Sequence, residues 1–378
     1  MGNRRAGLPR LTGLRWYAAL LVFLYHVEIT VPWRFLRPFN FGTVGVTFFF
    51  VLSGFVLAWS TRPDLPAPTF YRRRLARIYP SYILVFALTV LTIAIWPGME
   101  LTRGWLGIVA TIFMIQAWIP TANYPVFAYD APEWSLSCEA FFYVVFPFVL
   151  RILRMLTPRR RDVVVVVSLL LAVLASSLLV RSHFSIEYTN PLIRLPEFVF
   201  GMWLAIKVEE GWRPRIPMWV AVVITGISYD VARKLGASVY AGQGDYVILL
   251  PIGLLLVAAA VADLDGKRGM LANSVSIYFG EVSFAFYLVQ VPMILLVSHL
   301  VSPQHAWTTL HSIAILVASF VTSMGAAVLL HHLVELPLQR RLRGQGAPSI
   351  ATEDPELLAA ENDSRSHGDV QPGRDSRL

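Results

Sequence analysis

Long apolar stretches alternate with short polar ones along most of the chain. Eleven such stretches occur near residues 12–31, 41–60, 78–96, 104–119, 135–154, 162–180, 192–208, 217–234, 244–262, 279–301 and 307–331. A helix needs about 20 mostly apolar residues to cross the hydrocarbon core of a bilayer, and most of these stretches have about that length. The pattern predicts an all-α polytopic membrane protein.

The stretch 104–119 is the shortest of the eleven; it begins at Gly104 and ends before Pro120. We expect this stretch to be re-entrant, dipping into the membrane and returning to the same side. About ten transmembrane helices then remain, and the N and C termini are both expected to be cytoplasmic. Apart from three arginines in residues 344–378, this topology places 22 Lys and Arg residues on the cytoplasmic side and seven outside, as the positive-inside rule requires.

The composition agrees with this class. The chain is 56% hydrophobic and 15% charged, whereas about a quarter of the residues of a soluble domain are charged. The net charge of +8 comes from arginines in short clusters between apolar stretches, so we expect no nucleic-acid partner. The single cysteine, Cys138, excludes an internal disulfide and a multi-thiolate metal site. The histidines lack the spacing of helical metal ligands, and no metal site is expected.

Residues 344–378 differ in composition from the rest and are rich in Gly, Pro, Ser, Asp and Glu. A segment of this kind buries too little apolar surface to offset the entropy lost on folding. We therefore expect a membrane domain over residues 1–343, followed by a disordered cytoplasmic tail.

Two polar residues stand out in the first stretch. Arg15 and His26 are eleven residues apart, so they share one helix face at a separation of about 16 Å. An ionisable side chain at that depth usually marks a function, and an imidazole can exchange a proton near neutral pH. The alternatives are a histidine that hydrogen-bonds a neighbouring helix and an arginine that extends to lipid phosphates.

Other charged residues lie near later stretches. Arg73, Arg74 and Arg77 precede the third stretch, and the last two share a helix face. Paired guanidinium groups suit phosphates such as those of coenzyme A, although positive-inside charge in contact with anionic lipid explains the cluster as well. Glu139 lies about one turn inside the 135–154 stretch; it could orient His26 or be a simple interfacial carboxylate.

Small and polar residues mark two further places. Gly42 and Gly45 share a face of the second stretch, on which a neighbouring backbone can approach closely. Ser53 lies toward the inner half of that stretch, where it could line a cavity, although helix packing alone also accounts for it. Arg194 and Glu197 form a possible charge pair, either structural or facing an acceptor.

Taken together, these segments resemble the acyltransferase 3 family of integral membrane O-acyltransferases, over about residues 11–343. The motifs that carry the resemblance are Arg15-x10-His26, Gly45-Val46-x-Phe48-Phe49 with Leu52-Ser53-Gly54-Phe55, Arg73-Arg74-x-x-Arg77-Ile78-x-Pro80, Trp134-Ser135-Leu136-x-x-Glu139-x-x-Phe142-Tyr143 and Glu335-x-Pro337. The family has ten spans, with an interrupted stretch before its Trp-Ser-Leu motif. Many members carry His where this chain has Gln290, so we assign that position no proton-transfer role.

The resemblance implies transfer of an acyl group from cytoplasmic acyl-coenzyme A, with acetyl-coenzyme A as the expected donor. The acceptor would be a hydroxyl of a carbohydrate-containing molecule, such as an envelope glycan, a glycolipid or a glycosylated secondary metabolite like a macrolide. The enzyme would lie in a bacterial inner or plasma membrane, in contact with its lipids, and would hold no permanent cofactor.

On this hypothesis the catalytic residues are His26, Arg15 and Glu139, and His26 is the general base that deprotonates the acceptor hydroxyl. The donor-binding residues are Arg73, Arg74, Arg77 and Ser53. A covalent acyl-histidine intermediate is an open variant. The competing class is a transporter or flippase for an amphipathic substrate, because ten spans with buried polar residues fit that class too; a catalytically silent membrane sensor is a third possibility.

Overall fold

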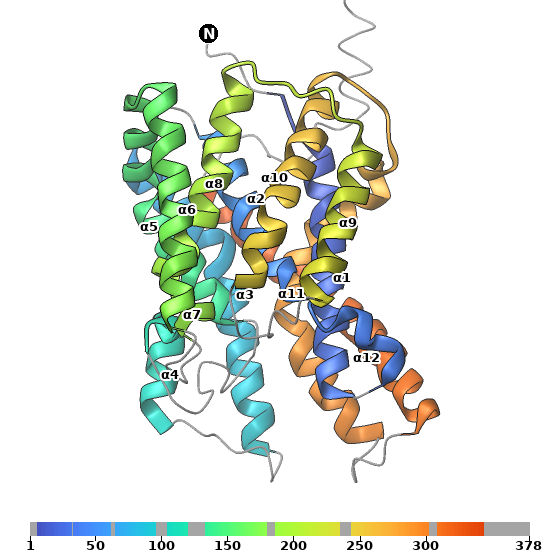
Figure 1. The fold of residues 1–378 in the computed structure, drawn as a ribbon. Helices are drawn as coiled ribbons and strands as arrows, with labels where there is room; N and C mark the ends of the chain where they lie inside the picture. The colour runs from blue at the N-terminus through green and yellow to red at the C-terminus, as the bar shows by residue number, and fades with distance from the viewer. Residues whose placement is uncertain are drawn as a thin grey trace, which may run out of the picture. The chain divides into compact units, whose positions relative to one another are not determined.

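The computed structural model describes residues 6–31, 33–61, 65–95, 104–119, 133–179, 186–234, 243–301 and 308–343. All regular structure in these ranges is helical (Figure 1). The α-helices are α1 (Pro9–Thr30), α2 (Val44–Ser60), α3 (Ala67–Ile95), α4 (Gly104–Ile112), α5 (Glu133–Met155), α6 (Pro158–Leu179), α7 (Ile186–Thr189), α8 (Pro191–Glu209), α9 (Met218–Lys234), α10 (Gln243–Leu264), α11 (Ser274–Val301), α12 (Thr309–Leu330) and α13 (Leu336–Arg343). The predicted tail, 344–378, lies outside the described residues.

Seven helical segments of the described chain are long and apolar enough to cross a membrane. They are Arg34–Ser60, Ala67–Thr92, Glu133–Met155, Pro158–Leu179, Asp245–Leu264, Ser274–Val301 and Thr309–Arg341. The predicted count of ten is not confirmed, and the cytoplasmic placement of both termini stays a prediction. Of the other three predicted spans, α1 and α8 form helices that carry charged residues along their length, and α9 has 17 residues.

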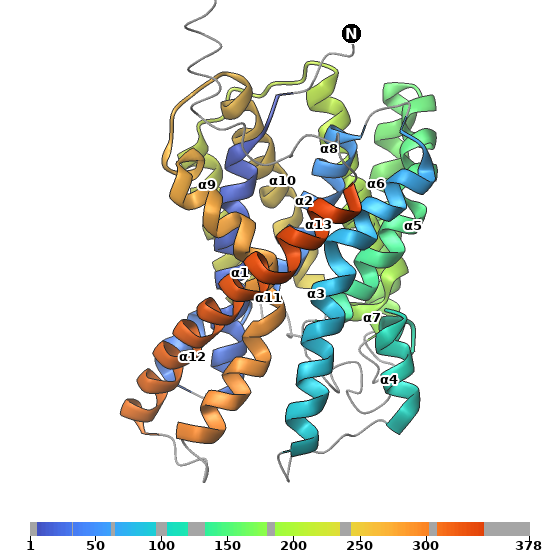
Figure 2. The ribbon, with the colours of Figure 1, turned by 180° about the vertical axis from the view of Figure 1, so that it is seen from behind.

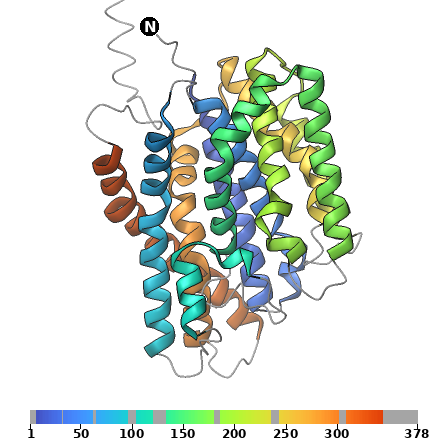
Figure 3. The same ribbon diagram turned by 90° about the vertical axis from the view of Figure 1, so that its left-hand side faces the viewer.

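The stretch 104–119 forms a short helix and a turn. Its helix, α4, has nine residues, about half the length that a membrane crossing needs. Met114 follows with φ of 55°, a left-handed conformation that reverses the chain. Gln116 then donates to the Glu133 carbonyl at 2.9 Å, which ties the turn to α5. Figure 3 shows α4 beside α3, at the end of the bundle where α3 ends.

The third span begins earlier than hydropathy predicts. Helix α3 starts at Ala67, so Arg72, Arg73, Arg74 and Arg77 lie on its first turns instead of in a loop. The hydropathy pattern does not include these turns in the span, because their side chains are charged. The helical start fixes the relative directions of these arginines.

Helix α2 lies in the middle of the bundle and packs against α1, α5, α8 and α10 (Figure 1). Its glycines permit close crossings on two sides. A Cβ on Gly42 or Gly45 would meet the backbone of α1, as the sequence predicts. Gly54 and Gly201 make a reciprocal contact between α2 and α8. A Cβ added to either glycine would collide with a carbonyl of the other helix. Small residues therefore set the helix spacing at the centre of the fold.

A buried ion network joins α8 to its neighbours. Arg194 pairs with Glu197 at 2.9 Å and with Asp245 of α10 at 2.6 Å, and all three side chains are almost fully buried. The same guanidinium donates to the Thr47 hydroxyl of α2 at 2.9 Å and lies 5.4 Å from the centre of the Phe50 ring. The predicted Arg194–Glu197 pair is thus present, within a larger network.

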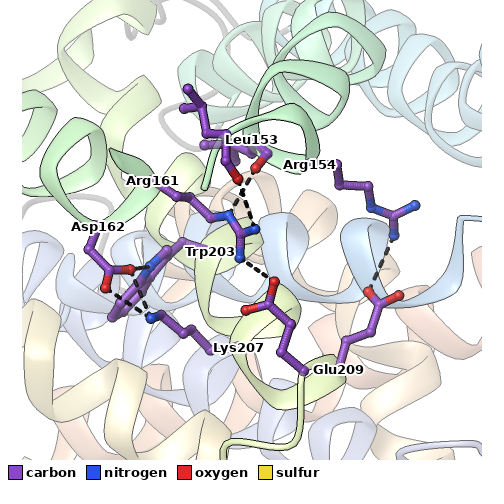
Figure 4. Close-up of polar contacts among 9 residues, drawn as sticks. Leu153, Arg154, Arg161, Asp162, Trp203, Lys207 and Glu209 are labelled. Atoms are coloured by element: carbon purple, nitrogen blue, oxygen red, sulfur yellow. Dashed lines mark hydrogen bonds and ion pairs between the residues drawn. The ribbon is translucent and has the colours of Figure 1, made fainter. Parts of the chain in front are cut away.

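A second polar cluster joins the ends of α5, α6 and α8 (Figure 4). Arg161 donates to the Leu153 carbonyl at 2.8 Å and to Glu210 at 2.7 Å. Asp162 accepts from Lys207 at 2.9 Å and from the Trp203 indole at 2.7 Å. These contacts hold the α5–α6 turn against the end of α8.

We predict that Gly201→Val destabilises the protein. The new side chain would overlap the Val51 carbonyl, and overpacking of this kind costs about 1–3 kcal/mol. The melting temperature of the detergent-purified protein should fall clearly below that of the wild type. Gly226→Ala is the control, because a Cβ there meets nothing within 4 Å; equal melting temperatures for the two variants would contradict the close crossing.

We also predict that Arg194→Gln is destabilising, by about 3–5 kcal/mol if the effect of other broken buried ion pairs applies. The substitution leaves two buried carboxylates, Glu197 and Asp245, without their cation. Size-exclusion chromatography after mild heating should show early loss of the folded peak. Arg233→Gln, which removes a half-exposed pair with Asp230, should behave like the wild type.

Candidate functional site

A cavity of about 100 Å³ lies between α1, α2, α3, α5 and α11. Its lining residues are Arg15, Val46, Phe49, Phe50, Leu52, Ser53, Val56, Leu57, Arg74, Arg77, Ile78, Ser135, Leu136, Glu139, Tyr143, Phe284 and Tyr287. Three arginines and a carboxylate thus face a cavity whose other walls are mostly apolar. Charge interactions beside such apolar walls are stronger than in bulk water.

Five residues singled out in the sequence meet at this cavity. They are Arg15, Ser53, Arg74, Arg77 and Glu139. They come from four helices and are separated by up to 124 positions in the chain. Tertiary packing therefore joins two of the three predicted donor-binding arginines to two of the predicted catalytic residues.

Glu139 belongs to the arginine group of the cavity. Its carboxylate accepts from the Tyr143 hydroxyl at 3.4 Å and lies within electrostatic range of Arg15, Arg74 and Arg77. Its described contacts are therefore with the cavity cations and a tyrosine on its own helix. This arrangement places a carboxyl group among cations that would otherwise only repel one another.

Hydroxyl groups complete the polar part of the cavity. The Ser53 and Tyr143 side chains lie near each other across α2 and α5. The Ser135 and Tyr287 hydroxyls are 2.9 Å apart and join α5 to α11. The Tyr287 ring also meets Phe49 edge-on, with centroids 5.8 Å apart. Ser135, Tyr287 and Phe49 form one wall of the cavity, which we call the Tyr287 wall.

His26 is not among the residues that line the cavity. Helices α1 and α11 run side by side in the same direction, with Phe23 packed on Phe286 at 5.5 Å. His26 follows Phe23 by three residues and Gln290 follows Phe286 by four, so the two lie at about the same level. This level is about one turn beyond Tyr287. Of the two cavity residues on α11, Phe284 and Tyr287, the second therefore lies nearer to the level of His26.

The His26 side chain is 8% exposed. The Val22 carbonyl, one turn earlier, approaches the imidazole, but Nδ1 makes no hydrogen bond of normal geometry with any described residue. Gln290 is fully buried, and its Oε1 is likewise without a hydrogen bond within the described part of the chain. Buried polar atoms of this kind are uncommon in native proteins and are often associated with function.

Arg73 is not among the cavity-lining residues either. It lies next to Arg74 on α3, and successive residues of a helix point in directions about 100° apart. The structure thus brings two of the three predicted donor-binding arginines into the cavity and leaves the third outside it.

Sequence reasoning assigned no role to three polar residues of the cavity: Ser135, Tyr143 and Tyr287. Ser135 and Tyr143 belong to the same motif as Glu139, and spacings of four residues along a helix could have placed them beside it. Tyr287 is one of several aromatic residues in α11, and its sequence context does not distinguish it from packing residues.

Comparisons with known proteins show the family of the chain. The acyltransferase domain signature matches residues 8–332. The chain is 33% identical to acyltransferase MdmB of Streptomyces mycarofaciens over 384 aligned residues, which cover 94% of this chain and 97% of that protein. It is 23% identical to O-acetyltransferase OatA of Staphylococcus aureus (strain NCTC 8325 / PS 47), over 88% of this chain and 57% of that protein.

A putative O-acetyltransferase, SACOL0978 of Staphylococcus aureus (strain COL), is also 23% identical, over 74% of this chain and 50% of that protein. The chain therefore spans about half the length of these staphylococcal relatives and nearly all of MdmB. No solved structure matches the chain. The extent of the domain match, the MdmB relative and the apolar helices together show that the chain belongs to the acyltransferase 3 family of multi-pass membrane O-acyltransferases.

Proposed function

We propose that this protein transfers an acyl group from cytoplasmic acyl-coenzyme A to a hydroxyl of a carbohydrate-containing acceptor. The observation that carries this proposal is the meeting of Arg15, Arg74 and Arg77 in one small cavity. The acceptor class, whether an envelope glycan, a glycolipid or a glycosylated secondary metabolite, follows from the resemblance to the family.

The arginines support a donor that carries phosphate groups. Each guanidinium can make two parallel hydrogen bonds to a phosphate, and its charge persists at all physiological pH values. Glu139 balances part of this charge, and the remaining positive charge attracts an anion. We assign the phosphates of coenzyme A to Arg74 and Arg77, with Arg73 assisting from outside the cavity and Ser53 lining the path of the thioester.

The size of the cavity supports a short acyl group. A cavity of roughly 150 Å³ is known to hold one benzene molecule, whereas this cavity measures about 100 Å³. An acetyl group fits such a space. Acetyl-coenzyme A is therefore the donor that we propose.

His26 is the general base of the proposed reaction. Its imidazole takes the proton of the acceptor hydroxyl while the hydroxyl oxygen attacks the thioester carbonyl. The tetrahedral intermediate then expels the coenzyme A thiolate, which the imidazolium reprotonates. Base catalysis of this kind contributes about 10²- to 10⁴-fold to rates. Because His26 lies beyond the Tyr287 wall, we propose that side chains of that wall move as the thioester approaches.

Arg15 and Glu139 act at the donor end of this mechanism. Arg15 lies about 16 Å from His26 along α1, and the Glu139 carboxylate lies among the arginines. We therefore propose that both residues orient the donor in the cavity.

The test of the proposed function is acyl transfer by isolated membranes that contain the protein. They would receive labelled acetyl-coenzyme A and a pool of glycolipids, glycan fragments and glycosides, and products would be identified by mass spectrometry. An acylated product that depends on the protein supports the proposal. Movement of an unmodified amphipathic substrate without acylation would instead favour the transporter alternative.

We predict that His26→Ala abolishes transfer, with a loss of at least about 10²-fold, because no base remains to accept the hydroxyl proton. The measurement is the rate of labelled product formation per amount of membrane-inserted protein. His311→Ala serves as the control, because His311 lies at the start of α12, outside the cavity. Substantial residual transfer by His26→Ala would remove the base assignment.

We predict that Arg74→Glu raises the KM for acetyl-coenzyme A by about tenfold or more, because a hydrogen bond to a charged group contributes about 1.5–3 kcal/mol. Arg72→Glu is a matched control: it makes the same charge change one turn or less away, but its side chain is exposed and does not line the cavity. If both variants raise KM equally, the effect is one of general surface charge and the phosphate assignment is wrong.

A further inference from the structure

A second pair of ionisable residues lies close to the cavity and has no part in the mechanism above. His331 Nδ1 is 2.7 Å from Glu335 Oε2. The two residues are 5% and 3% exposed. The other carboxylate oxygen, Glu335 Oε1, is buried and makes no hydrogen bond with any residue in the described ranges. A buried carboxylate oxygen without a hydrogen bond is costly, and buried carboxylates are therefore usually paired with a cation.

The backbone here departs from the α-helix. Residues His331–Glu335 form a π-helical turn between α12 and α13, in which the Leu336 N–H donates to the His331 carbonyl. Pro337 follows, and it has no N–H to donate to the carbonyl four residues earlier. Single π turns inside α-helices occur frequently at functional sites. Through this π turn, α12 continues into α13 in nearly the same direction, and the two helices run obliquely across the bundle toward α3 (Figure 2).

The course of α12 and α13 places the Glu335 carboxylate near the arginines of the cavity. The π turn packs against α3, which carries Arg74 and Arg77. Arg15 lies within electrostatic range of Glu335, Glu139 and Arg77. Arg15 therefore has one carboxylate on the α5 side and another on the α12–α13 side, and a like charge on α3.

We propose that Glu335 is a positioning residue for acyl transfer: the charge of its carboxylate attracts the Arg15 guanidinium through space and keeps it at the cavity, and His331 holds that carboxylate in place. This inference rests on the proposed function, because it concerns the same cavity. The π turn is the structural device that directs both side chains of the pair inward from one helix.

The proposal predicts opposite effects on turnover and on donor binding. Loss of the Glu335 charge lets Arg15 move, so the thioester is held less accurately and kcat falls. The same loss removes a negative charge beside three arginines, so the attraction for an anionic donor does not weaken. A purely structural role of Glu335 would instead distort the cavity and weaken both.

The experiment uses full-length protein purified in detergent and four variants of similar size: Glu335→Gln, Glu335→Asp, His331→Gln and His332→Gln. Turnover is the rate of coenzyme A release from acetyl-coenzyme A with the acceptor pool described above, and Kd is measured with coenzyme A itself. Glu335→Gln should lower kcat by about tenfold, because the lost attraction between the Glu335 carboxylate and the Arg15 guanidinium acts through space, and its Kd should be no weaker than that of the wild type.

The remaining variants define the role. Glu335→Asp keeps the charge and should recover part of the lost kcat. His331→Gln should lower kcat by about threefold to tenfold, the range for an ordinary hydrogen bond. His332→Gln is the matched control, because His332 lies in the same π turn but is exposed and pairs with the Tyr278 hydroxyl at 3.2 Å; it should behave like the wild type.

A double-mutant cycle with Arg15→Gln distinguishes positioning from general damage. If Glu335 acts through Arg15, then Glu335→Gln adds no further loss of kcat in the Arg15→Gln background. Additive losses, or a weaker Kd in Glu335→Gln, would overturn the inference while leaving the proposed function intact. If the wild-type protein itself neither binds coenzyme A nor cleaves the thioester, the proposed function fails instead, and this inference fails with it.

Discussion

Burial of arginine within an apolar helical bundle is the constraint on which this structure depends. A guanidinium cannot be neutralised, so each buried one requires carboxylates from other parts of the chain. Arg194 obtains two, Glu197 on its own helix and Asp245 on α10. Arg15 likewise lies between two carboxylates, Glu139 and Glu335. These compensating charges join helices that are distant in sequence and determine which of them can line the cavity.

The two arginine groups differ in what surrounds them. The Arg194 network is almost completely enclosed, with its cation against the Phe50, Trp134 and Tyr188 rings, so it acts as a fixed support. The Arg15 group borders empty space and contains more cations than carboxylates. The two are linked, because Phe50 contacts the Arg194 guanidinium on one side and lines the cavity on the other.

Most helices could be predicted from the sequence, because spans of about 20 apolar residues have few alternatives in a bilayer. The number of membrane crossings could not. Helices α1 and α8 fail a hydropathy criterion because other helices surround them, so polar residues are tolerated there. The start of α3 was missed because charged turns resemble a loop. Five of the seven predicted catalytic and donor-binding residues line one cavity, whereas His26 and Arg73 lie outside it.

The sequence by itself determined the class of protein, the family and the residue types available for chemistry, because hydropathy and motif spacing are local properties of the chain. Only the tertiary structure decided which of those residues meet. It placed Glu139 among the arginines, put Tyr287 about one turn from the level of His26, and brought Glu335 within electrostatic range of Arg15 through a π turn. Such contacts depend on helix rotation and crossing, which are set by close-packed glycines and buried charges far apart in the chain.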